Sequence, residues 1–146
     1  MGDYHKLEVW KLGSELSDRV AVLVGRLPAR IRADKGDQLA RAADAIHENI
    51  AEGCGLNTDP QLAKHLRISL GSANEVEDEL ATLKRRGLLP ESDHDLIPLS
   101  RRICAMLAKF IVTVDPPTAP VPRRRQPTAR PPLADSHSAL TDSREL

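Results

Sequence analysis

The chain is poor in aromatic side chains. Its 146 residues include one Trp, one Tyr and one Phe, so a hydrophobic core must be built from Leu, Ile, Val and Ala. Strands favour aromatic and β-branched residues, whereas Leu and Ala are good helix formers, so this composition favours helices packed on helices. The length is that of one ordinary domain. The sequence therefore predicts a single all-α fold.

Cysteines and long apolar runs are also scarce. Two cysteines, Cys54 and Cys104, cannot form a disulfide framework, and the first residues lack the apolar run of a signal peptide. The apolar stretch 20–24 is far shorter than the roughly 20 residues that cross a bilayer. We therefore expect a cytoplasmic protein with no membrane contact.

Neither sign of charge is in excess. The chain has 21 basic and 21 acidic residues, and segment 1–114 has 16 and 17. Clustered positive charge is the usual mark of a nucleic-acid-binding domain. The overall charge therefore gives no sign of such a partner, and any phosphate contact must come from a local concentration of Lys and Arg.

The composition changes abruptly at Asp115. Segment 115–146 holds seven of the eleven prolines and has no apolar periodicity. Such a segment cannot bury enough apolar surface to offset the entropy lost on ordering. We expect a folded domain over residues 1–114 and a disordered Pro/Arg-rich tail over residues 115–146.

Turn signals divide the domain into four apolar-periodic runs. The first spans about 5–27 and ends at Pro28, and the second spans about 37–52 with Gly53 as a helix-ending glycine. The third, capped by Thr58 or Asp59, continues to Gly87. Its apolar stripe has alternating spacings of four and three: Leu62, Leu66, Ser69, Ala73, Val76, Leu80 and Leu83.

The fourth run ends near Val114, but two starts are open. Ser92 is a good cap, which would leave Pro98 inside the helix to bend it, or the regular part begins near Pro98. Segment 29–36 is interpreted as a loop. Four helices with short connections predict an antiparallel up-down four-helix bundle.

Enzyme signatures are missing from the sequence. It has no P-loop, paired CxxC, nucleophile elbow or His-Glu-x-x-His motif. His47, Glu48 and Glu52 cluster on the second run. A solvated helix face is a simpler interpretation of this cluster than a metal or acid-base site. We expect no catalytic residue, metal or cofactor, and we expect His65 to be exposed or in an oligomer contact.

Two polar features suggest contacts between helices or subunits. Asn49 falls on an apolar stripe, where its amide needs hydrogen-bond partners. Gly71 lies in mid-helix, which costs about 0.5–1 kcal/mol relative to Ala and indicates a close approach. Arg67 and Glu75 share its face, so Arg67 could lie toward Glu75, reach Glu52 on a neighbouring helix, or form an intersubunit pair.

Three sequence segments carry a resemblance to a known family. "KLEVWK" at 6–11, "QLARAADAIHENIAEGCG" at 38–55 and "LRISLGSANEVEDEL" at 66–80 resemble the bacterial four-helix-bundle proteins encoded within intervening sequences of large-subunit ribosomal RNA genes. That family includes the accessory variability determinant protein of diversity-generating retroelements. The match covers about residues 4–112. Its most specific residues run from Asn49 to Gly53, including Glu52, together with Arg67, Gly71, Ser72 and Glu75.

The resemblance implies a homopentamer, and for the retroelement members binding of nucleic acid and of a reverse transcriptase. We therefore expect a non-catalytic oligomeric scaffold that binds RNA or DNA, or a nucleic-acid enzyme such as a reverse transcriptase. Trp10, a large side chain in a chain with few, is a candidate interface anchor. The candidate nucleic-acid contacts are Arg26, Arg30, Arg32, Lys64, Lys84, Arg85 and Arg86, with Arg123, Arg124 and Arg125 as an auxiliary arm. The alternative is a protein-only adaptor ring with no nucleic-acid contact.

Overall fold

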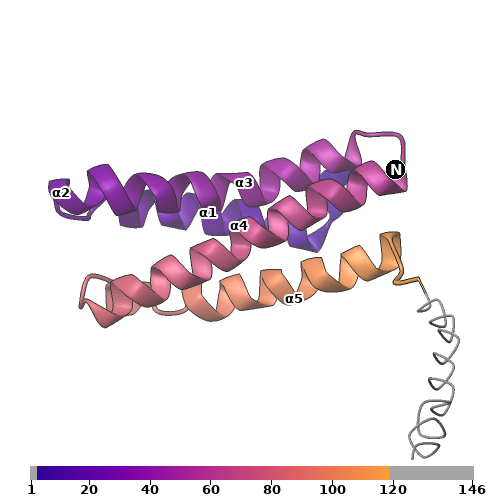
Figure 1. The fold of residues 1–146 in the computed structure, drawn as a ribbon. Helices are drawn as coiled ribbons and strands as arrows, with labels where there is room; N and C mark the ends of the chain where they lie inside the picture. The colour runs from indigo at the N-terminus through magenta and orange to yellow at the C-terminus, as the bar shows by residue number, and fades with distance from the viewer. Residues whose placement is uncertain (1–2, 119–146) are drawn as a thin grey trace, which may run out of the picture.

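The computed structural model describes residues 3–118, which form four long helices (Figure 1). These are α1 (Glu8–Gly25), α3 (Asp37–Cys54), α4 (Asp59–Arg85) and α5 (Leu96–Val114). Shorter turns precede or join them: η1 (Tyr4–Lys6), α2 (Ala29–Ile31), η2 (Arg32–Gly36) and η3 (Glu91–Asp93). Residues 3–118 contain no strand, so the predicted all-α class is confirmed. None of the helices in this range is long and apolar enough to span a membrane.

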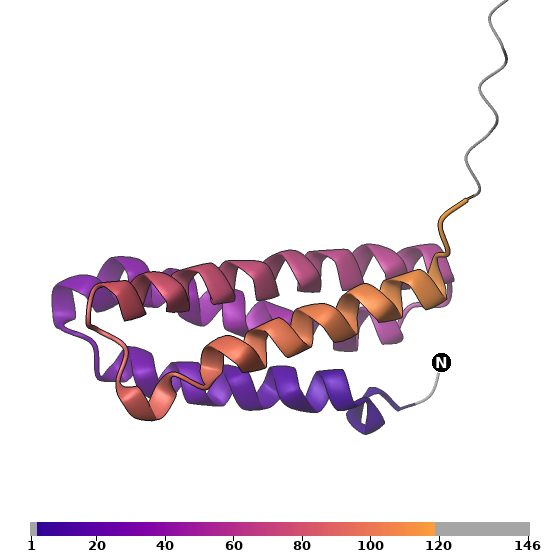
Figure 2. The ribbon, with the colours of Figure 1, turned by 90° about the horizontal axis from the view of Figure 1, so that it is seen from below.

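The four helices run alternately up and down, as predicted. In the two views α1 lies beside α3, α3 beside α4 and α4 beside α5 (Figures 1 and 2). This order places the α1–α3 and α4–α5 connections at one end of the bundle, which we call the connection end. The N-terminus, the α3–α4 connection and the end of α5 lie at the other, which we call the terminal end.

The core is built from the predicted apolar stripes. All seven stripe residues of α4 are buried, and they face buried Leu, Ile and Ala side chains of α1, α3 and α5. The one polar member, Ser69, donates its hydroxyl hydrogen to the backbone oxygen of Ile46 at 2.8 Å. That bond satisfies a polar group inside the core and ties α4 to α3.

Both ends of α4 are closed as the sequence predicts. The hydroxyl of Thr58 accepts from the backbone N–H of Gln61 at 3.4 Å. At the other end Gly87 has φ +70°, a left-handed conformation that glycine adopts without steric cost. Gly87 donates to the oxygen of Lys84 and Leu88 to that of Leu83, so the last carbonyls are bonded by main chain.

Segment 29–36 corrects a prediction. The segment expected to be a loop is helical: α2 and η2 run without interruption into α3. Pro28 immediately precedes this helical stretch, where a fixed φ favours helix initiation, and the Ala and Arg residues that follow are good helix formers. The second helical run therefore begins near Ala29 and not at Asp37.

Pro98 does not bend α5. The helix begins at Leu96, between the two starts that the sequence left open, so Pro98 is its third residue. The first four N–H groups of a helix have no intrahelical acceptor, and a proline there removes no hydrogen bond.

Gly53 was wrongly interpreted as a helix-ending glycine. Helix α3 continues to Cys54, and Gly55 takes the cap position. Gly53 is buried against α4, where a Cβ atom would lie 2.9 Å from the Cβ of His65 and 3.0 Å from Cδ1 of Leu62. The missing side chain therefore lets the ends of α3 and α4 approach each other closely.

α5 ends at Val114, and residues 115–118 follow it without regular structure. Most of the expected tail, including Arg123, Arg124 and Arg125, lies outside the described residues. The division into a domain over 1–114 and a tail stays a prediction.

Replacing Gly53 with Ala should destabilise the bundle. The added methyl meets the Cβ of His65, which cannot rotate away, so we expect a loss of about 1–3 kcal/mol in the free energy of unfolding, measured by urea denaturation. Gly25→Ala is the matched control, because a Cβ at that helical position meets nothing within 4 Å. Equal stability of Gly53→Ala and the parent would contradict the close approach.

Candidate nucleic-acid interface

Six of the ten predicted nucleic-acid-binding residues lie at the connection end. They are exposed and come from the α1–α3 connection and the end of α4: Arg26, Arg30, Arg32, Lys84, Arg85 and Arg86. Within residues 3–118, none of the six forms an ion pair with a carboxylate. Their charges are therefore available to a ligand.

The balance of charge is local. Segment 26–36 holds four basic residues and one acidic residue, and segment 84–95 holds three of each. Two of the acidic residues in the second segment, Asp93 and Asp95, are bonded to Arg19. Lys35 pairs with Glu79, so these two segments hold six unpaired cations against two unpaired carboxylates, Asp34 and Glu91. A local excess of positive charge of this kind is what a phosphate backbone requires.

Main-chain hydrogen bonds at the C-terminus of α4 indicate what the three cations there, Lys84, Arg85 and Arg86, are not needed for. Basic side chains at a helix C-terminus can serve only to complement the helix dipole and cap its carbonyls. Here the backbone oxygens of Thr82, Leu83 and Lys84 already accept main-chain hydrogen bonds. The side chains of Lys84, Arg85 and Arg86 are thus not needed as caps.

A groove of about 400 Å³ lies between the end of α4 and the start of α5. Its apolar lining comes from both helices, and three cations and a histidine complete it: Ala81, Lys84, Arg85, His94, Ile97, Pro98 and Arg101. Arg101 is fixed by its Nε, which donates to Glu77 at 2.6 Å. Positive charge and apolar surface thus meet in one concave site.

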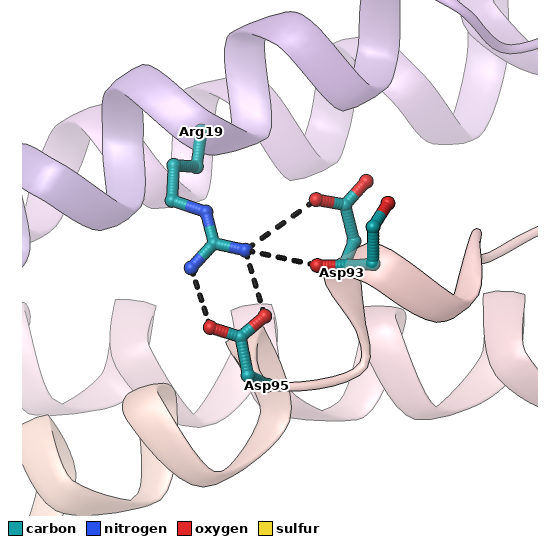
Figure 3. Close-up of polar contacts among 4 residues, drawn as sticks. Arg19, Asp93 and Asp95 are labelled. Atoms are coloured by element: carbon teal, nitrogen blue, oxygen red, sulfur yellow. Dashed lines mark hydrogen bonds and ion pairs between the residues drawn. The ribbon is translucent and has the colours of Figure 1, made fainter.

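Arg19 holds the segment that carries His94 (Figure 3). From α1 its guanidinium donates to both carboxylate oxygens of Asp95, at 2.6 and 2.7 Å, and to Asp93 at 3.5 Å. It also reaches the backbone oxygen of Ser92 at 3.4 Å. These contacts tie the start of α5 to α1, a pair of helices that otherwise touch little.

The same contacts change the acidity of the two partners. The hydrogen bonds from Arg19 hold the pKa of the Asp95 carboxyl below its ordinary value, and the bond to Asp95 raises the pKa of Arg19. Both groups are therefore charged at neutral pH. The Arg19–Asp95 ion pair is therefore present in the folded protein at neutral pH.

Lys64 and Arg67 do not join the basic end. Both lie near the start of α4, at the terminal end, about 30 Å (Lys64) and about 26 Å (Arg67) from Lys84 along a helix that rises 1.5 Å per residue. Within residues 3–118 Arg67 forms an ion pair with Asp115 and none with Glu75 or Glu52, two of the three arrangements that the sequence left open. The reason is topological: α5 ends beside the first turns of α4.

His65 corrects another prediction. Its side chain is only 17% exposed, and its Nδ1 lies 3.1 Å from Oδ1 of Asn49. The amide nitrogen of Asn49 donates to the oxygen of Ala45 at 2.8 Å, so the amide oxygen faces the histidine and can only accept. His65 therefore carries a hydrogen on Nδ1, and Glu52 lies 4.0 Å from that nitrogen. Asn49 thus links α3 to α4.

The face of Gly71 is open in this chain. A Cβ at Gly71 would meet nothing within 4 Å, so no close approach within residues 3–118 explains the glycine. Ser72 is half-buried and Glu75 is exposed on the same side of α4. Ile68, at the helical spacing that shares this face, is 45% exposed.

Trp10 belongs to an aromatic cluster at the terminal end. Its ring packs edge-on against Tyr4, His5 and His47, with centroids 5.4, 5.0 and 6.3 Å away. His47 therefore faces Trp10, whereas Glu48 and Glu52 are exposed. In the described part of the chain, no three His, Cys, Asp or Glu side chains are grouped so as to hold a metal ion.

Arg19, His94 and Arg101 were not among the residues predicted from the sequence. Arg19 and Asp95 are 76 positions apart, and the groove joins residues of α4 to His94, which follows η3, and to residues of α5. No local spacing connects such residues. The only available signal was the predicted antiparallel pairing of the third and fourth runs.

Replacing Arg19 with Gln should loosen the connection end in a pH-dependent way. Because the Asp95 pKa is lowered on folding, the pair stabilises the protein above the ordinary carboxyl pKa of about 3.9 and loses that effect as pH falls below it. The urea midpoint should therefore drop at pH 7, with a smaller difference near pH 3. Arg41→Gln is the control, because it removes a charge from an exposed i,i+4 pair that contributes little. A pH-independent difference would contradict the role given to Asp95.

Comparisons with known proteins place the fold in a family. A crystal structure titled as a protein of unknown function from the S23 ribosomal protein family of Bacteroides thetaiotaomicron matches with a TM-score of 0.65 and 24% identity, covering 70% of this chain and 94% of that chain. No curated protein matches. The family model described as 23S rRNA-intervening sequence protein matches residues 5–109. The chain therefore belongs to the 23S rRNA-intervening sequence protein family.

Proposed function

We propose that this protein is a non-catalytic helical scaffold whose connection end binds nucleic acid. The observation that carries the proposal is a set of six exposed Lys and Arg side chains at that end, from the α1–α3 connection and the end of α4. None of the six is paired with a carboxylate of residues 3–118. Affinity for nucleic acid comes chiefly from Lys and Arg that neutralise phosphates and release counterions. A neutral chain can bind a backbone in this way because its charges are separated in space.

The family match supports the same proposal. Its members are described by their association with intervening sequences of 23S ribosomal RNA. The groove beside Lys84 and Arg85 adds a concave surface to the charge. A reverse transcriptase is the enzyme partner that the sequence resemblance implies, and it remains a proposal.

A second candidate is a protein-only adaptor, and a different groove favours it. At the terminal end about 440 Å³ of open space lies over Leu7, Met106 and Phe110, with the side chains of Lys109 and Thr113 at its edge. These apolar side chains are half-buried in the chain. A partner protein could cover them without any nucleic-acid contact.

Binding of RNA and DNA by the parent separates the two candidates, and removing charge from one end at a time locates the contact. The variant Lys84→Gln/Arg85→Gln/Arg86→Gln should weaken binding of labelled RNA and DNA oligomers, measured by fluorescence anisotropy. The salt dependence should also flatten, by about 0.7–0.9 in log–log slope for each phosphate that the variant no longer neutralises. The matched control, Lys6→Gln/Lys11→Gln/Lys64→Gln, removes the same charge from the terminal end and should bind like the parent.

Equal weakening by the two triple variants would contradict the assignment to the connection end. A parent chain that binds neither RNA nor DNA at low salt would contradict nucleic-acid binding and favour the adaptor.

We also propose that the chain forms a homo-oligomer, a pentamer by the sequence resemblance, through the face of α4 that carries Gly71. Small residues let helices approach closely, and Ile68, Gly71, Ser72 and Glu75 share this open face at helical spacing.

Light scattering should then return a multiple of the 16.0 kDa chain mass. Gly71→Leu should reduce that mass while the helical circular dichroism stays, because Gly71 is exposed and a Cβ there would meet nothing within 4 Å among residues 3–118. Gly25→Leu, at an open helical position at the connection end, is the control. A monomeric mass for the parent at micromolar concentration would contradict the proposed homo-oligomer.

A further inference from the structure

We infer that the groove between α4 and α5 takes an unpaired nucleotide, with the base on the apolar floor and the adjoining phosphates on Lys84 and Arg85. The inference rests on the proposed function and narrows it, because it makes single-stranded nucleic acid the preferred ligand over a duplex.

The floor of the groove is the first reason. Ala81 comes from α4 and Ile97 and Pro98 from α5, and together they place apolar surface between cations. The phosphates of a duplex would satisfy the cations, but its bases are stacked and paired, so nothing would cover this floor. Each nucleotide of a single strand carries a charged phosphate and, a few ångströms away, the exposed apolar face of its base. The volume of about 400 Å³ lies within the range of small-ligand sites.

The state of Arg101 is the second reason. Its Nε donates to Glu77 at 2.6 Å, which orients the guanidinium beside the groove while the side chain stays 65% exposed. Neither Nη group has a hydrogen-bond partner among residues 3–118. A guanidinium held in this way presents a flat face for a base and free N–H donors for a phosphate or a base edge. Because Glu77 offsets its charge, Arg101 would orient a bound nucleotide more than it would strengthen the attraction for the phosphates.

His94 supplies a further polar group of defined direction. Its Nε2 lies 3.2 Å from the backbone oxygen of Leu89, which only accepts, so this nitrogen carries the hydrogen. In the neutral ring Nδ1 is then an acceptor, suited to an amino group of a base or a ribose hydroxyl. Arg19 bonds to the residues on both sides of His94, which fixes the backbone that carries the ring.

The ligand itself tests the inference with the full-length protein. Anisotropy is measured with three labelled probes of about 12 nucleotides: oligothymidylate, an abasic oligomer with the same phosphates, and a duplex. Oligothymidylate should bind at least about fivefold more tightly than the abasic oligomer, since stacking of even one base has an effect of that size. The duplex should bind more weakly than oligothymidylate.

A variant that fills the floor places the effect in the groove. Ala81→Leu adds bulk without changing charge, so it should weaken oligothymidylate binding at least about fivefold and leave the abasic oligomer unaffected. Ala108→Leu makes the same change on an exposed part of α5 outside the groove and should bind like the parent. Circular dichroism checks that both variants fold.

The outcomes separate this inference from the proposed function. Equal binding of oligothymidylate and the abasic oligomer by the parent overturns the inference and leaves nucleic-acid binding standing. Tighter binding of the duplex than of oligothymidylate does the same. Loss of oligothymidylate binding in a folded Ala108→Leu, equal to that in Ala81→Leu, shows that the base lies elsewhere. No binding of any probe by the parent overturns the proposed function itself.

Discussion

Burial of the apolar stripe of α4 is the constraint on which the rest of the structure depends. With three aromatic residues in the whole chain, the core gains its stability from many small and medium side chains, and seven of them lie on this one helix. Such a core requires close helix approach, because small side chains leave voids when helices stand apart. Ser69 and Gly53 meet that requirement where α4 packs on α3, one by bonding a backbone oxygen and the other by having no side chain.

The position of α4 in the bundle also determines where the cations of its last turn lie. Its length of 27 residues carries its last turn to the connection end, where Gly87 stops it and the main chain closes its carbonyls. The cations of that turn are left facing solvent beside the first turn of α5. Arg19 of α1 is bonded to Asp95 just before α5, so the α5 wall of the groove is tied to α1 as well as packed on α4.

The fold was largely predictable from local patterns, whereas the site was not. The stripe of α4, its Thr58 cap and its Gly87 stop are all encoded within a few residues, and periodicity finds them. Gly53 was misread because its role depends on α4, which packs against it. The same holds for His65, which is half-buried where α4 packs against Gly53 and Asn49 of α3. Lys84 and Arg85 were found as a run of charge, but the groove they border needs Ile97 and Arg101 from another helix. Sequence spacing carries no record of such contacts.

Arg67 pairs with Asp115 at the end of α5, and that point is remote from the groove. Arg123 follows Asp115 by eight positions, which span at most about 29 Å when fully extended. The axis of α5 between the two ends of the bundle measures about 28 Å. Because these two lengths are similar, the segment after Asp115 is long enough to bring Arg123 to the groove of its own chain only when that segment is close to fully extended along α5.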